Sequence, residues 1–157
     1  PETDPVIDDI SLVSYLASKG RDLPVDVHIA GALTKGLNGQ SLTEIGLMKE
    51  AGAKYFSNGS TAIPEAQTMR RLMAYAANFN ALIANRAIEP SLNADTAAHE
   101  SSLSSRLGLR AAPAMSERIM AERAIALAEL TGGSILIDLI SSELALDSIG
   151  RAKAKDL

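Results

Sequence analysis

A regular alternation of strand-like and helix-like segments is the feature that most limits how this chain can fold. Strand patterns begin near residues 25, 53, 81 and 134, and a helical pattern fills each gap between them. Such alternation is typical of a parallel sheet built through right-handed crossovers and covered by helices. The first two intervals are equal and the third is about twice as long, which indicates an insertion in an α/β fold.

Short apolar runs predict the strands. They are residues 25–30, 54–57, the run that opens at Ala81, and 134–141. The last run is almost continuously apolar, as expected for a strand with both faces covered. Between Glu89 and Pro113 the pattern lapses into small and polar residues, with one short helix predicted over 100–107. We interpret that segment as a long insertion on the active-site side of the fold.

Apolar residues at helical spacing, together with capping signals, predict the main helices. Asp8 or Asp9 can cap the first helix, and Ser41 and Glu44 have the spacing of a capping box for the second. The expected helices are 10–20, 42–51, a segment from Pro64 to about Asn78, one capped by Ser116 and ended by Gly132, and one that starts at Glu143.

Composition limits the classes of function. The chain has 157 residues, a formal net charge of −4, no cysteine and no cluster of lysines and arginines. Counterion release from nucleic acid needs clustered cations, so we expect no nucleic-acid partner. No apolar run approaches the roughly 20 residues that cross a bilayer, so we expect no membrane partner. The absence of disulfides is compatible with the cytoplasm, which is the expected location.

Four strands leave two interpretations of the architecture open. One is an open α/β sheet, and the other is the middle of a larger barrel, because a closed (β/α)8 barrel usually needs about 250 residues. The sequence opens on Pro1 and stops at Leu157 near the end of an amphipathic stretch. We expect residues 1–157 to form a single partial domain that lacks its N-terminal and C-terminal parts.

The segment after Ala81 is where we expect a functional site. It begins as a strand and turns polar where a barrel strand would open into its active-site loop. The residues there are Arg86, Ile88 and Glu89. An arginine side chain has five donors, no acceptor and a permanent charge, so it cannot ligate a cation. The position is typical of catalysis, but the residue types are not.

The two histidines do not predict a metal site. We expect His28, within a predicted strand, to have a packed or hydrogen-bonded structural role, and His99, in the polar insertion, to be solvated. An acidic cluster precedes the first helix, where negative charge favours the helix N-terminus. Its members are Glu2, Asp4, Asp8 and Asp9.

Several short motifs follow one another along the whole chain. They are residues 1–5 (Pro-Glu-Thr-Asp-Pro), 31–36 (Gly-Ala-Leu-Thr-Lys-Gly), 47–53 (Leu-Met-Lys-Glu-Ala-Gly-Ala), 56–57 (Phe-Ser), 89–92 (Glu-Pro-Ser-Leu), 105–109 (Ser-Arg-Leu-Gly-Leu) and 128–132 (Ala-Glu-Leu-Thr-Gly). In this order they resemble landmarks of bacterial dihydroorotases of the amidohydrolase superfamily. The resemblance implies a metal-dependent hydrolase of the (β/α)8 TIM-barrel type, of which this chain is the middle portion with about four βα units.

The resemblance also implies which positions carry the chemistry in active members. Those members bind zinc through histidines and a carboxylate, and the metal-bound hydroxide attacks the ring amide of dihydroorotate. The family's substrate-binding asparagine falls on Glu2, and its metal ligands fall on Gly59, Arg86 and Leu139. None of these three side chains offers a lone pair to a metal. We therefore expect no cofactor, no metal and no catalytic residue at these positions.

The leading hypothesis is a catalytically inactive dihydroorotase-like protein of pyrimidine biosynthesis that acts as a structural subunit of an oligomer. The partner that the family implies is aspartate carbamoyltransferase. The alternative is an active or weakly active dihydroorotase or cyclic amidohydrolase, whose reduced metal site is completed by residues outside this sequence. A third hypothesis is a barrel that binds a small anion at Arg86. We also expect the charge of Arg86 to replace the cations, with Glu89 as its partner.

Overall fold

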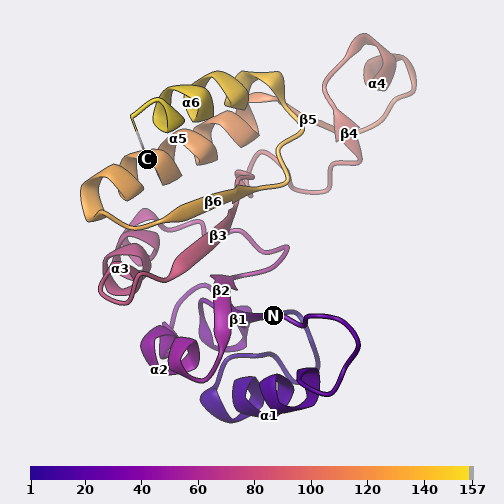
Figure 1. The fold of residues 1–157 in the computed structure, drawn as a ribbon. Coiled ribbons are helices and arrows are strands. Elements are labelled where there is room, and N and C mark those ends of the chain that lie inside the picture. Colours follow the sequence, from indigo (N-terminus) through magenta and orange to yellow (C-terminus); the bar gives the residue numbers. More distant parts are fainter. Residues whose placement is uncertain (156–157) are drawn as a thin grey trace.

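The structure of the protein, a computed structural model, describes residues 1–155 and is built around a curved sheet with helices along it (Figure 1). Its elements in chain order are α1 (Ile10–Gly20), β1 (Ile29–Ala32), the short 3-10 helix η1 (Lys35–Leu37), α2 (Ile45–Glu50), β2 (Ala53–Ser57), α3 (Ala66–Ala77), β3 (Leu82–Arg86), β4 (Ala98–His99), α4 (Ser102–Arg106), β5 (Ala111–Ala112), α5 (Met115–Thr131), β6 (Ile135–Asp138) and α6 (Glu143–Lys153).

The main sheet has the order β1-β2-β3-β6, and every neighbouring pair is parallel. This confirms the predicted parallel α/β architecture. The insertion between β3 and β6 holds its own small parallel pair, β4 and β5. Figure 1 shows α4 standing off from the sheet at the end of this insertion. The insertion therefore leaves and rejoins the sheet without interrupting the pairing of β3 with β6.

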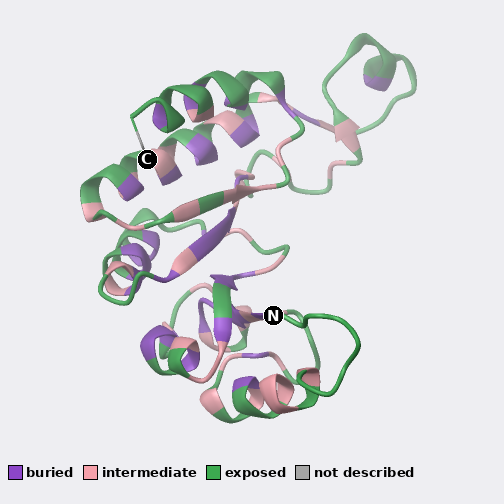
Figure 2. Ribbon diagram, viewed as in Figure 1, coloured by how far each residue is buried: buried purple, intermediate pink, exposed green. Residues whose placement is uncertain are grey.

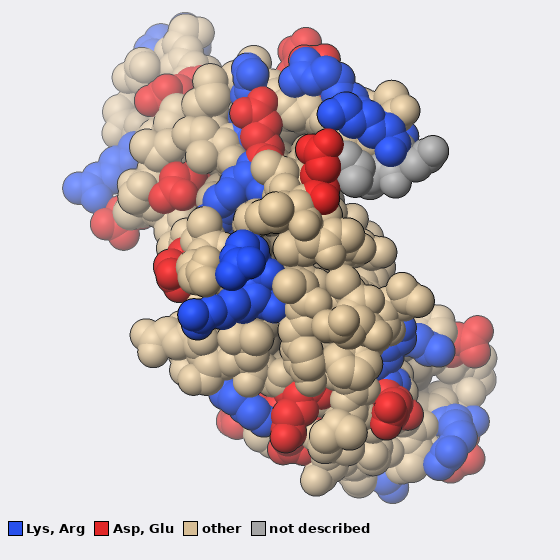
Figure 3. Space-filling model, turned by 90° about the vertical axis from the view of Figure 1, so that its left-hand side faces the viewer, with Lys and Arg blue, Asp and Glu red and all other residues tan. Residues whose placement is uncertain are grey.

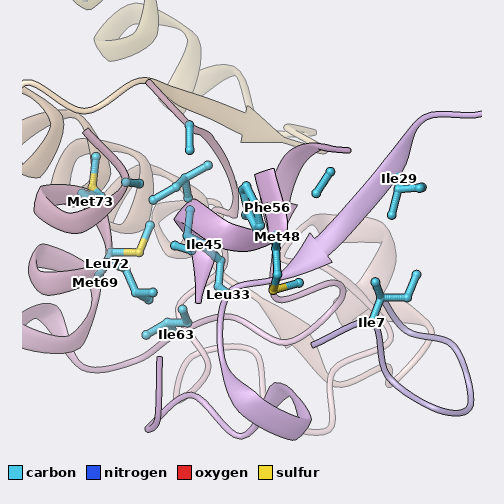
Figure 4. Packing of buried hydrophobic residues seen from close by; sticks show 14 of the residues in the cluster. Ile7, Ile29, Leu33, Ile45, Met48, Phe56, Ile63, Met69, Leu72 and Met73 are labelled. Atoms are coloured by element: carbon cyan, nitrogen blue, oxygen red, sulfur yellow. The ribbon is translucent and has the colours of Figure 1, made fainter. Parts of the chain in front are cut away.

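A continuous apolar core lies between the sheet and the helices. It joins Phe56 and Ile83 of the sheet to methionines and leucines of α2 and α3 (Figure 4). Burying each of these large side chains contributes about 1.5–3 kcal/mol of hydrophobic stabilisation. A smaller cluster around Met120, Ala121 and Ala145 joins α5 to α6. In Figure 2 β3 is mostly buried, β2 has both buried and exposed residues, and the outer faces of the helices are exposed.

The predicted strand over residues 25–30 is wrong in its bounds. Val25 and Val27 are exposed, and β1 begins only at Ile29, which is the first residue in register with β2, opposite Ala53. The alternation of valines imitates a strand, but no neighbouring strand pairs with it. His28 therefore lies before β1 and is exposed, so the structural role expected for it is also wrong.

The predicted capping box at Ser41 and Glu44 does not form. The helix begins at Ile45, and the Glu44 side chain makes no capping hydrogen bond. The preceding residues bind the end of β1 instead, because the Thr43 hydroxyl donates to the carbonyl oxygens of Ala32 and Leu33 at 2.6 and 3.2 Å. Tertiary hydrogen bonds have displaced the local capping pattern.

The elements around the insertion show two further differences. Helix α5 begins at Met115, so Ser116 lies inside its first turn rather than at its cap, although Gly132 ends the helix as predicted. Strand β6 is shorter than predicted and forms an edge of the sheet within residues 1–155, where Leu136 is exposed. Other signals are confirmed, since Asp9 caps α1 and the short helix in the insertion is α4.

Charged side chains of both signs are spread over the surface. On the face shown in Figure 3, Lys and Arg side chains are interspersed with Asp and Glu. Among the helices of the described chain, none is both long and apolar enough to cross a membrane.

Candidate functional site

The carboxyl ends of β2, β3 and β6 surround a cavity of about 380 Å³. Parallel strands bring their carboxyl ends to one edge of a sheet, so residues far apart in sequence meet there. Glu2, Gly59, Arg86 and Leu139 all line this cavity. The structure thus brings together all four residues that the sequence matched with the family's substrate and metal-ligand positions.

Arg86, the last residue of β3, stands opposite Asp138 in the register with β6. Its Nε is buried without a hydrogen-bond partner. Within residues 1–155 no ion pair involves its guanidinium group. Arg86 therefore brings to the wall of the cavity a positive charge that forms no direct ion pair within residues 1–155, although the charge of Glu2 is near enough to interact with it.

Glu89 is not the partner of Arg86 that the sequence suggested. The Glu89 carboxylate accepts hydrogen bonds from the backbone N–H and the hydroxyl of Ser91, at 3.1 and 2.7 Å. These bonds, the hydroxyl first, lower the pKa of Glu89 below its usual value. The Glu89 carboxylate therefore forms its hydrogen bonds within its own turn and forms none with Arg86.

Glu2 and Gly59 occupy one space. Gly59 has a φ of +64°, and a Cβ placed on it would lie 2.2 Å from the Glu2 Cδ. The Glu2 carboxylate is held there by the backbone N–H of Ser60 at 2.9 Å and by the Ser60 hydroxyl. The hydroxyl bond is the main cause that lowers the pKa of Glu2, and the charge of Arg86 acts in the same direction. Glu2 thus fills the volume that a side chain at residue 59 would need.

Leu139 follows β6 directly and lines the cavity with an apolar side chain that is 65% exposed. Its φ of +54° lies in the left-handed region, which costs a non-glycine residue about 1–2 kcal/mol. The backbone turn at this position aims the chain from β6 toward Ser141 and Ser142. No metal-binding group is presented here.

A second, smaller cavity of about 290 Å³ lies on the other side of Arg86, between β3 and the insertion. Polar side chains are frequent in its lining, which includes Arg86, Asn93, Thr96, His99, Ser116, Glu117 and Ser141. The Nε2 of His99 lies 2.9 Å from the Ser141 hydroxyl. His99 is exposed, as expected for a solvated residue, but it also fastens the insertion to the loop after β6.

Glu117 is a buried acidic residue at the smaller cavity that was not predicted from the sequence. Its carboxylate, only 5% exposed, accepts the backbone N–H groups of Ser141 and Ser142 at 2.9 and 2.7 Å, and also the Ser141 hydroxyl. Burial alone would raise the pKa of Glu117, but these hydrogen bonds together lower it below its usual value. Glu117 lies at helical spacing from Met120 and Ala121, a signal that places it on the buried face of α5.

The residues at the two cavities do not fit a zinc site. No group of three or more His, Cys, Asp or Glu side chains that could hold a metal ion is found in the part of the chain that the structure describes. A protein zinc site needs at least three such ligands. Glu2 and Asp138 line the larger cavity, but so does the guanidinium of Arg86, which repels a cation.

Comparison with known proteins agrees with the motifs. The family described as dihydro-orotase-like matches residues 1–144. The chain is 38% identical over 157 residues to a dihydroorotase of Desulfotalea psychrophila, and 36% identical over 155 residues to one of Pelotomaculum thermopropionicum. The two alignments cover 100% and 99% of this chain. The chain spans only 37% and 36% of the length of these relatives.

Solved structures show the same fold. An L-hydantoinase (dihydropyrimidinase) from Arthrobacter aurescens superposes with a TM-score of 0.76 at 17% identity, over 99% of this chain and 36% of that enzyme. A D-hydantoinase from a Bacillus species gives a TM-score of 0.64 at 17% identity, over 93% of this chain and 34% of the other. The four parallel strands are therefore part of a TIM barrel rather than an open sheet. The chain belongs to the dihydroorotase-like family of amidohydrolase-type barrels.

Proposed function

We propose that this protein is a cytoplasmic, dihydroorotase-like protein of pyrimidine biosynthesis that has lost catalysis and serves as a structural partner of aspartate carbamoyltransferase in an oligomer. One observation carries the proposal. Glu2, Gly59, Arg86 and Leu139 line a single cavity at the end of the sheet where barrel enzymes hold their catalytic groups. The changes in residue type are therefore concentrated at one place.

The chemistry of that cavity supports the loss of catalysis. Amide hydrolysis needs an activated water, and water without a metal has a pKa of about 15.7 instead of about 7. Arg86 supplies only donors and a fixed charge. The lowered pKa of Glu2 makes its carboxylate a weak general base near neutral pH. The cavity therefore lacks both a metal ligand set and a strong base.

The packing of the rest of the chain supports a structural role. The core between the sheet and α2 and α3 is closely packed, with Phe56, Met69 and Met73 fully buried. A subunit kept for its shape needs this core and does not need a metal. The partner and the oligomeric state rest on the family resemblance.

Co-purification tests the partnership. The full-length protein is expressed with a tagged aspartate carbamoyltransferase from the same organism, and the complex is isolated by affinity and size-exclusion chromatography. We expect a stable complex, and we expect Arg86→Gln to leave it intact because Arg86 lines a cavity at the end of the sheet and is only partly exposed. A carbamoyltransferase that assembles and turns over normally without this protein contradicts the proposal.

A weakly active enzyme is the second candidate, and the name dihydroorotase carried by relatives 33–38% identical to this chain favours it. In this case residues outside the present sequence would complete a reduced metal site. Metal analysis of the full-length protein separates the two. We expect far less than one zinc per chain and no turnover of dihydroorotate. Stoichiometric zinc together with turnover would establish the enzyme instead.

A further inference from the structure

We propose that the smaller cavity beside β3 binds a small oxyanion, a carboxylate or a phosphate group, through the guanidinium of Arg86. The cavity measures about 290 Å³ and lies between Arg86 and the insertion residues Asn93 and His99. The proposal is independent of the structural role proposed above, because a subunit without catalysis can still bind a ligand.

The state of Arg86 is the first observation that points to an anion. Its Nε is buried without a partner, and no carboxylate among residues 1–155 forms an ion pair with it. Only the Nε is closed off from water, and Arg86 as a whole is partly exposed, so its terminal N–H groups are open to a ligand. A guanidinium group offers two parallel N–H donors that match the oxygens of a carboxylate or phosphate. An oxyanion would therefore accept hydrogen bonds from donors that no acceptor among residues 1–155 uses.

The lining of the smaller cavity is compatible with negative charge. Glu117 is the one acidic residue in that lining. Its carboxylate is already occupied by donors from Ser141 and Ser142. The amide of Asn93 and the second ring nitrogen of His99 add polar groups that could contact a ligand.

The larger cavity is the poorer anion site. Glu2 and Asp138 both line it, and they face the same arginine from that side. Glu2 is hydrogen-bonded to Ser60 just as Glu117 is to Ser141, so the two linings differ in the number of carboxylates, and two repel an incoming anion more strongly than one. Because the smaller cavity has fewer carboxylates in its lining, we place the anion there, beside the insertion.

The size of the cavity limits the ligand. Pockets for drug-sized ligands range from about 300 to 1,000 Å³, so this one lies at the lower limit. It suits a short carboxylic acid or a single phosphate group.

Isothermal titration calorimetry on the full-length protein tests the site with two probes, malonate and inorganic phosphate, at constant ionic strength. We expect saturable binding of at least one probe. Arg86→Gln should weaken it at least tenfold, and Arg86→Lys should weaken it less, because lysine keeps the charge but loses the paired donors. Arg71→Gln is the matched control, since Arg71 is exposed on α3, and it should bind as the unaltered protein does.

The two probes separate the sources of the oxyanion. Binding of malonate alone indicates a carboxylate ligand, and binding of phosphate alone indicates a phosphate ligand. The proposal is overturned if neither probe binds at up to about 10 mM, well above a millimolar dissociation constant. It is also overturned if Arg86→Gln binds as tightly as the unaltered protein.

A second variant keeps the test decisive if Arg86→Gln does not fold. Ala97→Leu narrows the cavity from the exposed insertion and leaves the core untouched. We expect it to abolish binding, and unchanged binding would overturn the proposal. Assembly with aspartate carbamoyltransferase is measured separately, so failure of the anion site and failure of the structural role are distinguishable.

Discussion

The two sides of β3 face different surroundings. Ile83 and Asn85 are 1% and 3% exposed, and Ile83 belongs to the core shared with the helices. Leu82, Ala84 and Arg86, which alternate with them, line the larger cavity. Because side chains alternate along a strand, packing and chemistry use different residues of the same segment. Residues that line the cavity can therefore change while the residues that pack the core stay the same.

Substituting neighbours on β3 gives the largest effect and tests this contrast directly. We expect Ile83→Ala to lower the free energy of unfolding by about 2–5 kcal/mol, because it leaves a cavity in a packed core. Leu82→Ala on the other side should cost about 1 kcal/mol, because its side chain is only partly buried. Urea denaturation of the full-length protein measures both. Equal losses would show that the two sides of the strand are packed alike.

Glu117→Gln tests whether a residue that lines the smaller cavity is also needed for stability. We expect a loss of about 1–3 kcal/mol, because the amide N–H₂ faces donors from Ser141 and Ser142 that need an acceptor. Glu129→Gln, at an exposed position of the same helix, is the control and should cost less. Thermal unfolding measures the two. A similar cost for both would remove Glu117 from the residues that hold the loop.

The pH dependence sharpens the same comparison. The folded-state pKa of Glu117 lies below its usual value of 4.5, so its carboxylate stabilises the fold fully above that pH. The stabilisation is lost as the pH falls through the folded-state pKa. The difference between the unaltered protein and Glu117→Gln should therefore be constant near neutral pH and shrink below pH 4.5. A difference that does not shrink as the pH falls below 4.5 would contradict this assignment.

Gly59→Asp, which returns a carboxylate to a ligand position of the family, gives a smaller effect. We expect a loss of about 1–2 kcal/mol from the left-handed backbone alone. The clash with Glu2 adds to it, so Glu2→Ala in the same chain should recover part of the loss. Denaturation of the two single variants and the double variant measures the coupling. Strictly additive effects would mean that Glu2 does not occupy the space beside Gly59.

Much of the fold and family could be predicted because the signals are local. The period of apolar residues predicted α1, α3 and α6, and the ordered motifs along the whole chain implied the barrel through their resemblance to bacterial dihydroorotases. The predicted strand at residues 25–30 failed because a strand exists only where another strand pairs with it. The capping box at Ser41 failed because Thr43 found partners in β1, which no local pattern reveals.

The sequence predicted which residues line the site better than it predicted which residues they contact. The resemblance selected Glu2, Gly59, Arg86 and Leu139, and the structure brings them around one cavity. Glu89, three residues from Arg86, was expected as its partner, yet it bonds to Ser91 instead. Residues that are close in sequence can point in different directions at the end of a strand, because the chain turns there. Contacts such as that between Glu117 and Ser141 join distant segments and need the fold itself.

The contact between Glu2 and Gly59 also bears on the order in which substitutions can accumulate. A side chain at residue 59 has room only if the exposed Glu2 side chain gives up its hydrogen bonds to Ser60 and turns away. A single change at residue 59 therefore meets an obstacle that a prior change at residue 2 would remove. The two positions are therefore coupled, and a substitution at residue 2 that precedes one at residue 59 lowers the cost of restoring a metal ligand there.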